Sequence, residues 1–278
     1  MGGGIPDSAQ RRLAELGGGG LTSSFFGAAQ FAVGLADGVE PIGQVVGASS
    51  CRLAIGVVRR TRGPHGRLRG GPTWREYDGP VRSWTTARQR ALARLLAQAQ
   101  TLDADAVLGV TVHLEVRSVE PRLVEVVLMG TAVRVEPRDG RAPRAPVAAL
   151  TSPQEFCLLR RAGIDVVGIV GGFSSVSAAA SVATLNTAYR WRRGSVNQEF
   201  EDLTTCVYEA RRLAMQRLHA DAKAFGARGV IGVDISDSLS QREGGVVHMT
   251  ISVHALGTAV TSRAGVPSGP RAVIGLGA

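Results

Sequence analysis

Histidine and carboxylate side chains in the second half of the chain are the residues best suited to metal chemistry. His248 and His254 lie six positions apart in a run of alternating apolar and polar residues, so on a β-strand both face the same side. Asp234, in the preceding alternating segment, points to that same face. Since imidazole and carboxylate bind borderline divalent metals, these three residues and His113 of the first half are the candidate metal ligands.

The spacing of these ligands argues against a tight site on one strand. Residues six apart are separated by ~20 Å at ~3.3 Å per residue, so His248 and His254 cannot share one ion. The sequence also has no CxxC, CxH or HExxH motif. We therefore expect at most weak binding of a divalent transition metal, at a site completed by another strand or subunit. Histidines that line a surface or an interface are the alternative.

Arginine-rich segments suggest a second chemistry, the binding of phosphates and bases. Arginines alternate with aromatic residues between positions 59 and 77 and again between 189 and 193. However, the net charge of +9 comes almost entirely from arginine, which is typical of a coding bias, and a solvated loop is the more common explanation. Nucleic-acid or anion binding is therefore the alternative hypothesis. Its candidate residues are Arg59, Arg60, Arg62, Arg67, Arg69, Arg190, Arg192 and Arg193.

Motifs of catalysis and of membrane insertion are absent from the sequence. No Walker or GxGxxG motif occurs, and no serine, histidine and acid are arranged as in a hydrolase. The longest apolar runs are too short to cross a bilayer, and the first residues lack the features of a secretory signal. The three cysteines are far apart and fit buried free thiols. We expect a non-enzymatic, cytoplasmic protein.

An internal repeat organises the chain. Gly109 in LDADAVLGV corresponds to Gly232 in FGARGVIGV, 123 positions later, and the residues upstream of this segment repeat at the same spacing. Further along, LMGTAV recurs 127 positions later as ALGTAV. Near the start of each copy, GVEPIG recurs 125 positions later as GIDVVG. The chain is therefore a tandem duplication.

Each copy is expected to fold as strand, long loop, helix, strand and strand. The first strands are predicted at 42–46 and 166–170. Apolar residues spaced three and four apart predict helices at about 85–100 and 198–224. Gly226 is placed to end the second of these helices. Two alternating strands follow in each copy, so the helix must cover their apolar face in a two-layer α/β sandwich of the α+β type.

One stretch of the second copy is typical of a known family. The order GARGVIGV, preceded by ARxxAxxxL and followed by GTAV, resembles the YbjQ-like family of "putative heavy-metal-binding" proteins. Both copies show this resemblance, and together they span nearly the whole chain. It implies two tandem β-α-β-β modules, each dodecin-subunit-like with an antiparallel sheet and one helix. It also implies a homo-oligomeric ring, with a pentamer as the family-based expectation, and it assigns no metal ligand to a position here.

The predicted domain boundaries follow from the repeat. The flexible glycine-rich segment 1–20 precedes a first module at 21–137, and a linker at 138–147 leads to a second module at 148–263 and a flexible tail at 264–278. We expect the second module to fold alone. Within the tail, residues 271–278 are apolar enough to dock on a partner by strand addition.

Overall fold

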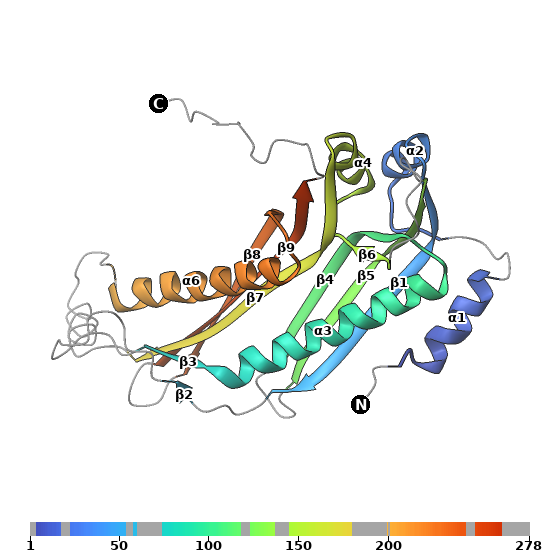
Figure 1. Ribbon diagram of the computed structural model, residues 1–278. Coiled ribbons are helices and arrows are strands. Elements are labelled where there is room, and N and C mark those ends of the chain that lie inside the picture. The colour runs from blue at the N-terminus through green and yellow to red at the C-terminus, as the bar shows by residue number, and fades with distance from the viewer. Residues whose placement is uncertain are drawn as a thin grey trace.

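The computed structural model describes residues 4–17, 23–53, 58–59, 74–117, 123–136, 145–179, 199, 201–242 and 248–262. They form two twisted sheets, each covered by a long helix (Figure 1). None of the described helices is long and apolar enough to span a membrane.

The first sheet is built from the first copy of the repeat and the segment that follows it. Its strand order is β1-β5-β4-β6, and helix α3 packs on one face. β1 pairs antiparallel with β5, and β5 with β4, whereas the short β6 runs parallel to β4. The elements are β1 (Val39–Arg52), α3 (Asp78–Thr101), β4 (Ala106–Arg117), β5 (Leu123–Val135) and β6 (Val147–Ala148).

The second sheet combines strands from both copies. Its order is β2-β3-β7-β9-β8, and helix α6 packs on β7 and β9. Strands β2 and β3 belong in sequence to the first copy, so the first copy contributes two strands to the sheet of the second. The elements are β2 (Val58–Arg59), β3 (Trp74–Tyr77), β7 (Ile164–Ala179), α6 (Glu201–Ala224), β8 (Gly229–Arg242) and β9 (His248–Ser262).

A glycine in each first strand lets the long helix press against the sheet. A Cβ atom at Gly47 would lie 2.0 Å from the carbonyl oxygen of Ala91 on α3. At the matching Gly172, a Cβ atom would lie 1.9 Å from the carbonyl oxygen of Ala214 on α6. Real Cβ atoms cannot approach so closely, so both copies need glycine at this point.

Two further glycines explain why the two copies are so alike in the strand that follows each long helix, β4 and β8. Gly109 and Gly232 have φ of +61° and +58°, and the pairing register shifts at both positions. A glycine in the left-handed region is the usual start of a β-bulge, which bends and twists the strand. Gly226, predicted to end α6, has φ of +67° as expected for a helix terminator.

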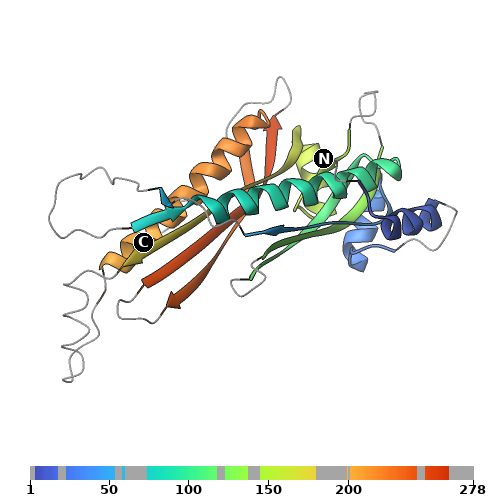
Figure 2. The same cartoon turned by 90° about the horizontal axis from the view of Figure 1, so that it is seen from below.

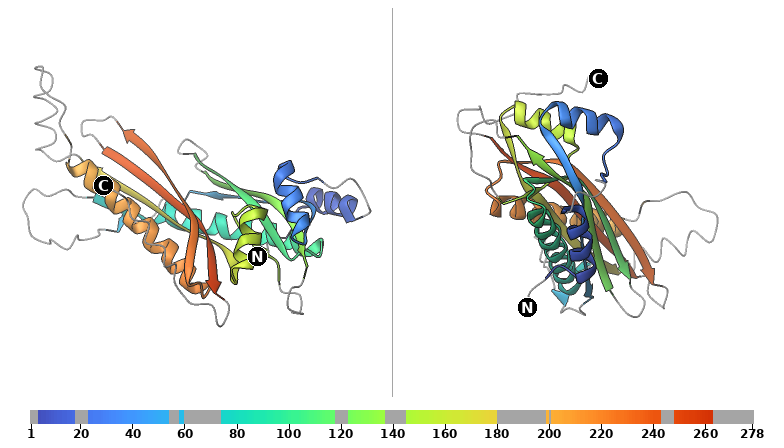
Figure 3. Two further views of the ribbon diagram at one scale, coloured as in Figure 1. Left: turned by 90° about the horizontal axis from the view of Figure 1, so that it is seen from above. Right: turned by 90° about the vertical axis from the view of Figure 1, so that its right-hand side faces the viewer.

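Three short helices were not predicted, which corrects the expectation of one helix per copy. They are α1 (Asp7–Gly17), α2 (Ala28–Ala36) and α4 (Pro153–Arg161). α2 and α4 occupy matching places before β1 and β7 and pack against each other (Figure 3), with an ion pair between Arg161 and Asp37. α4 carries a capping box between Ser152 and Glu155 and begins with a proline, a local signal that sequence reasoning overlooked.

The segment expected as a flexible N-terminal tail contains α1. Leu13 on α1 is only 3% exposed, because it packs on the core of the first sheet. The expectation of purely antiparallel sheets also needs correction, since β6 pairs parallel with β4 in the first sheet. The α+β class, with helices layered on sheets, is confirmed. The C-terminal residues 263–278, including the proposed docking segment, lie outside the described residues.

Candidate functional site at the join between the two copies

Strand β3 carries the first copy onto the second. It pairs antiparallel with the outer edge of β7, with Trp74 opposite Ala178 and Glu76 opposite Val176. Helix α3 begins directly after β3, beside the second sheet, and ends over the first sheet (Figure 2). We call the contact of β3 and the first half of α3 with β7 and α6 the join.

An ion pair anchors β3 at the join. Arg217 on α6 donates from Nη1 to Oε1 of Glu76 at 2.5 Å and from Nη2 to Oε2 at 2.9 Å. Its Nη1 also donates to the carbonyl oxygen of Phe173 at 2.8 Å. The Glu76 side chain is 5% exposed, so its negative charge is buried and is compensated by the bidentate hydrogen bonds from Arg217.

The first half of α3 supplies an aromatic and a cationic contact. Trp84 stacks on Phe173 of β7 with ring centroids 5.5 Å apart. Arg88, itself 5.4 Å from the Trp84 ring, donates to Asp221 Oδ2 at 2.6 Å and to the carbonyl oxygen of Ile169 at 3.3 Å. Asp221 also accepts the backbone N–H of Gly171 at 3.0 Å. Charged side chains thus satisfy the edge of β7 where none of the described strands covers it.

The first copy presents a matching surface along the outer edge of β1. Arg94 corresponds to Arg217 at the spacing of 123, and it donates to the carbonyl oxygen of Ala48 at 2.6 Å, as Arg217 does to Phe173. Gln98 corresponds to Asp221, and it both donates to and accepts from the backbone of Val46, at 2.7 and 3.1 Å. We call this edge, with Arg94 and Gln98, the β1 surface.

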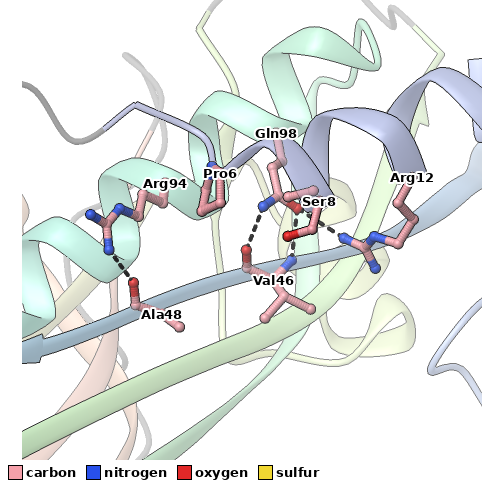
Figure 4. Close-up of a pocket in the computed structure, with 8 residues that line it drawn as sticks. Pro6, Ser8, Arg12, Val46, Ala48, Arg94 and Gln98 are labelled. Atoms are coloured by element: carbon pink, nitrogen blue, oxygen red, sulfur yellow. Dashed lines mark hydrogen bonds between the residues drawn. The ribbon is translucent and has the colours of Figure 1, made fainter.

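The β1 surface differs from the join in what lies on it. Among the residues that the structure describes, no carboxylate is within ion-pair distance of Arg94, and its Nε is buried without a hydrogen-bond partner. Helix α1 lies against this edge, and its Arg12 donates to Gln98 Oε1 at 3.0 Å (Figure 4). A pocket of about 320 Å³ remains between α1, β1 and α3, lined by Ser8, Arg12, Val46, Ala48, Arg94 and Gln98 among others.

The predicted metal ligands are divided between the two sheets. His113 is exposed on β4 of the first sheet, whereas Asp234 on β8 and His254 on β9 belong to the second. Ser236 pairs directly with His254, which puts Asp234 and His254 on one face as expected. His248 lies at the start of β9, opposite Arg242. Within the described part of the chain, no three His, Cys, Asp or Glu residues gather closely enough to hold a metal ion.

The environment of His254 favours its neutral form. Burial lowers the pKa of His254 below its ordinary value, and the negative charge of Asp234 opposes this shift without cancelling it. A neutral imidazole next to a carboxylate offers two of the ligands that a transition metal needs. The described residues do not supply the others, so they do not fit a closed metal centre.

Most of the arginines proposed for anion binding fall outside the described residues. Arg59 lies in β2, the outermost strand of the second sheet. The other seven, Arg60, Arg62, Arg67, Arg69, Arg190, Arg192 and Arg193, belong to segments that the structure does not describe.

Sequence reasoning missed the residues of the join. Glu76, Trp84 and Arg88 are individually indistinguishable from exposed residues at the start of a helix. Their partners, Arg217, Phe173 and Asp221, all belong to the other copy. The repeat itself was the available signal. At the spacing of 123, two arginines and two amide or acid side chains recur on the sheet-facing side of the long helices, where polar residues are otherwise rare.

Comparisons with known proteins agree with the duplication. The encapsulin nanocompartment protein Rv1762c of Mycobacterium tuberculosis (strain ATCC 25618 / H37Rv) is 32% identical over 177 residues, which is 63% of this chain and 64% of that protein. This chain therefore spans less than two thirds of the length of that relative. No solved structure matches. The family model YbjQ_1, described as "Putative heavy-metal-binding", matches residues 69–136 and 161–263, one region in each copy. The chain therefore belongs to the YbjQ family, with the family unit present twice.

Proposed function

We propose that this protein is a non-enzymatic assembly subunit whose chains join head to tail into a homo-oligomeric ring. One observation carries the proposal. Within a single chain, β3 of the first copy completes the second sheet along β7, whereas β1, the strand that corresponds to β7, forms the edge of its own sheet among the described strands. Because the second copy pairs with a strand of the first copy, the edge of β1 is left without such a strand in the described part of each chain.

An unfilled strand edge favours association because its backbone N–H and C=O groups can pair with a further strand. Contacts between two different surfaces of identical subunits generate a ring when the rotation closes. The join, with Trp84 stacked on Phe173, has the aromatic core typical of interfaces.

Measurement of the native mass tests the proposal. We expect light scattering to give a multiple of the 29.0 kDa chain mass, with five chains as the family-based expectation. A mass of one chain throughout the micromolar range would contradict self-assembly.

The similar mycobacterial protein suggests where such an assembly works. Because that relative is named as an encapsulin nanocompartment protein, we propose that this protein also associates with a protein shell. Co-expression with an encapsulin shell protein should give particles from which both chains co-elute. Separate elution under conditions that preserve the shell would contradict the association.

Weak metal binding is a second candidate, favoured by the acidic residue Asp234 beside His254. We propose that a divalent transition metal binds weakly there, with further ligands from another subunit. Titration calorimetry with zinc, nickel and copper on the wild type and on a His248→Ala/His254→Ala variant tests this, with His219→Ala, at an exposed position on α6, as the control. Equal weak heats from all three proteins would favour a purely structural role.

A further inference from the structure

We propose that the β1 surface binds Glu199 and the first turns of α6 from a second copy of this chain, and that α1 covers this surface until the second copy displaces it. The inference rests on the proposed self-assembly and names the residues that carry it. Its basis is that the join inside one chain shows how this type of surface is occupied.

Glu199 is the residue of the second copy that corresponds to Glu76. Each precedes its long helix by two positions, since α3 begins at Asp78 and α6 at Glu201, and the two are 123 positions apart. Glu76 is buried against Arg217, whereas Glu199 is exposed and accepts only the hydroxyl of Thr204, at 2.7 Å, among the described residues. Glu199 therefore occupies the position equivalent to that of Glu76 but has no arginine partner among the described residues.

Among the residues that the structure describes, Arg94 has no carboxylate partner. It repeats the bond of Arg217 to the strand carbonyl, at 2.6 Å to Ala48, yet it lacks the two bonds that Arg217 makes to Glu76. An exposed glutamate and a partly buried arginine at corresponding places are complementary in charge and geometry. Arg94 lies on α3 of the first copy and Glu199 just before α6 of the second, so two chains can satisfy both.

The backbone of β1 beside Arg94 can also pair with an added strand. β3 pairs with Val176, Ser177 and Ala178 of β7. At the spacing of 125, the corresponding residues are Cys51 and Arg52 at the end of β1 and Leu53 directly after it. No described strand pairs with this edge of β1.

Helix α1 occupies the path that the incoming helix needs. At the join, Arg88 of α3 bonds Asp221; on the β1 surface, Arg12 of α1 bonds Gln98, which corresponds to Asp221. One turn before Arg12, Ser8 lines the pocket with Val46 and Ala48, where the join holds the Trp84 ring between Gly171 and Phe173. The small serine leaves that space unfilled. α1 therefore makes the polar contact expected of the partner helix but not the aromatic one.

The residue of α6 that corresponds to Arg88 is Arg211, which is exposed. In the assembled state it takes the place of Arg12 at Gln98. Since α1 and α6 of a second copy require the same space, docking of α1 lowers the apparent affinity between chains.

A charge exchange tests the pairing. Arg94→Glu and Glu199→Arg each place like charges together, so sedimentation equilibrium should show each variant dissociating at concentrations where the wild type is assembled. The double variant restores opposite charges and should reassemble. Lys223→Glu, the same charge change at an exposed position on the last turn of α6, should not alter assembly. Because Glu199 is exposed, Glu199→Arg is expected to fold even if Arg94→Glu does not.

A second variant tests the competition with α1. Leu13→Asp removes the buried anchor of α1 and should lower the concentration at half-assembly by on the order of tenfold or more. Cys51 provides an independent readout, because Val176, the residue that corresponds to it at the join, is 0% exposed under β3. Alkylation of Cys51 by iodoacetamide should slow as the concentration of chain rises.

The outcomes separate this inference from the proposed function. An assembled wild type whose mass is unaffected by Glu199→Arg and Leu13→Asp would overturn the inference and leave self-assembly intact. Monomeric wild type and monomeric Leu13→Asp would overturn both. Rescue of assembly in the double charge variant, with protection of Cys51, would establish the pairing.

Discussion

At the scale of single residues, His254 links stability to pH. Burial depresses its pKa in the folded chain below the ordinary value of 6.5, with Asp234 opposing the shift. The unfolded chain therefore binds a proton more readily than the folded chain. The free energy of unfolding should be unaffected by this group above pH 6.5 and should fall as the pH drops from 6.5 through the pKa of the folded state.

Urea denaturation at several pH values measures this effect. We expect His254→Gln to flatten the loss of stability in the window below about pH 6.5. His113→Gln, a histidine substitution at an exposed position on β4, serves as the control. An identical slope in wild type and His254→Gln would show that burial of His254 is not coupled to folding.

The three thiols should differ in reactivity. Burial raises the pKa of Cys206 to about 11, and burial with the hydrogen bond and charge of Asp37 raises that of Cys157 to about 11 as well. Only the thiolate reacts with alkylating reagents, so both should be inert in the folded chain at neutral pH. Mass spectrometry of the folded protein, alkylated at a concentration low enough to keep the chains apart, should find Cys51 labelled first. Equal labelling of all three would contradict the buried positions.

At the scale of elements, the fit of each long helix on its sheet depends on one glycine. Gly172→Ala would push a methyl group into the backbone of α6, whose Ala214 oxygen lies 1.9 Å from the new atom. Overpacking of this kind costs about 1–3 kcal/mol, and more where backbone must move. Thermal or urea denaturation should show a clear loss of stability. Gly4→Ala, in open space, is the matched control.

The elements were predictable where the sequence pattern is local. The apolar stripes predicted α3 and α6, the alternating residues predicted the last two strands of each copy, and the repeat predicted their equivalence. β3 could not be predicted, because four residues carry little pattern and their pairing partner lies about a hundred positions away. α1 was missed because its flanking glycines suggest a tail, although Leu13 and Leu16 lie on its packed face.

The residues of the candidate site were likewise predictable only where the sequence pattern is local. The sequence placed Asp234 and His254 on one face of a strand pair, which the register of β8 and β9 confirms. The ion pair of Glu76 with Arg217 joins residues from different copies, so no local pattern reveals it. Only the fixed spacing between copies, applied to the helix arginines, could have pointed to it.

At the scale of the whole molecule, the two copies are expected to unfold together. Trp84 belongs to the same core as Val45 of the first sheet and as Ile169 and Phe173 of the second. The duplication alone suggests that residues 148–263 fold separately, but that fragment lacks β3 and the Trp84 ring. It should be markedly less stable than the intact chain.

Trp84→Ala tests this dependence in the full chain. Removing a buried tryptophan costs about 3–5 kcal/mol, and here it exposes β7 as well. Circular dichroism in urea should show one transition moved to lower denaturant, with helices and strands lost together. Tyr208→Ala, an aromatic residue that is 69% exposed on α6, is the control. Two separate transitions in the wild type would show that the copies are energetically independent.

Because β3 crosses from the first copy to the second, it also determines how many copies a closed assembly contains and which of its contacts can open. Because every chain brings two copies, a ring closed through such contacts contains an even number of copies. Its contacts alternate between those within a chain, whose partners are held together by the covalent backbone, and those between chains, which can open. Dilution or competition would therefore break such a ring at every second contact, releasing whole chains and never single copies.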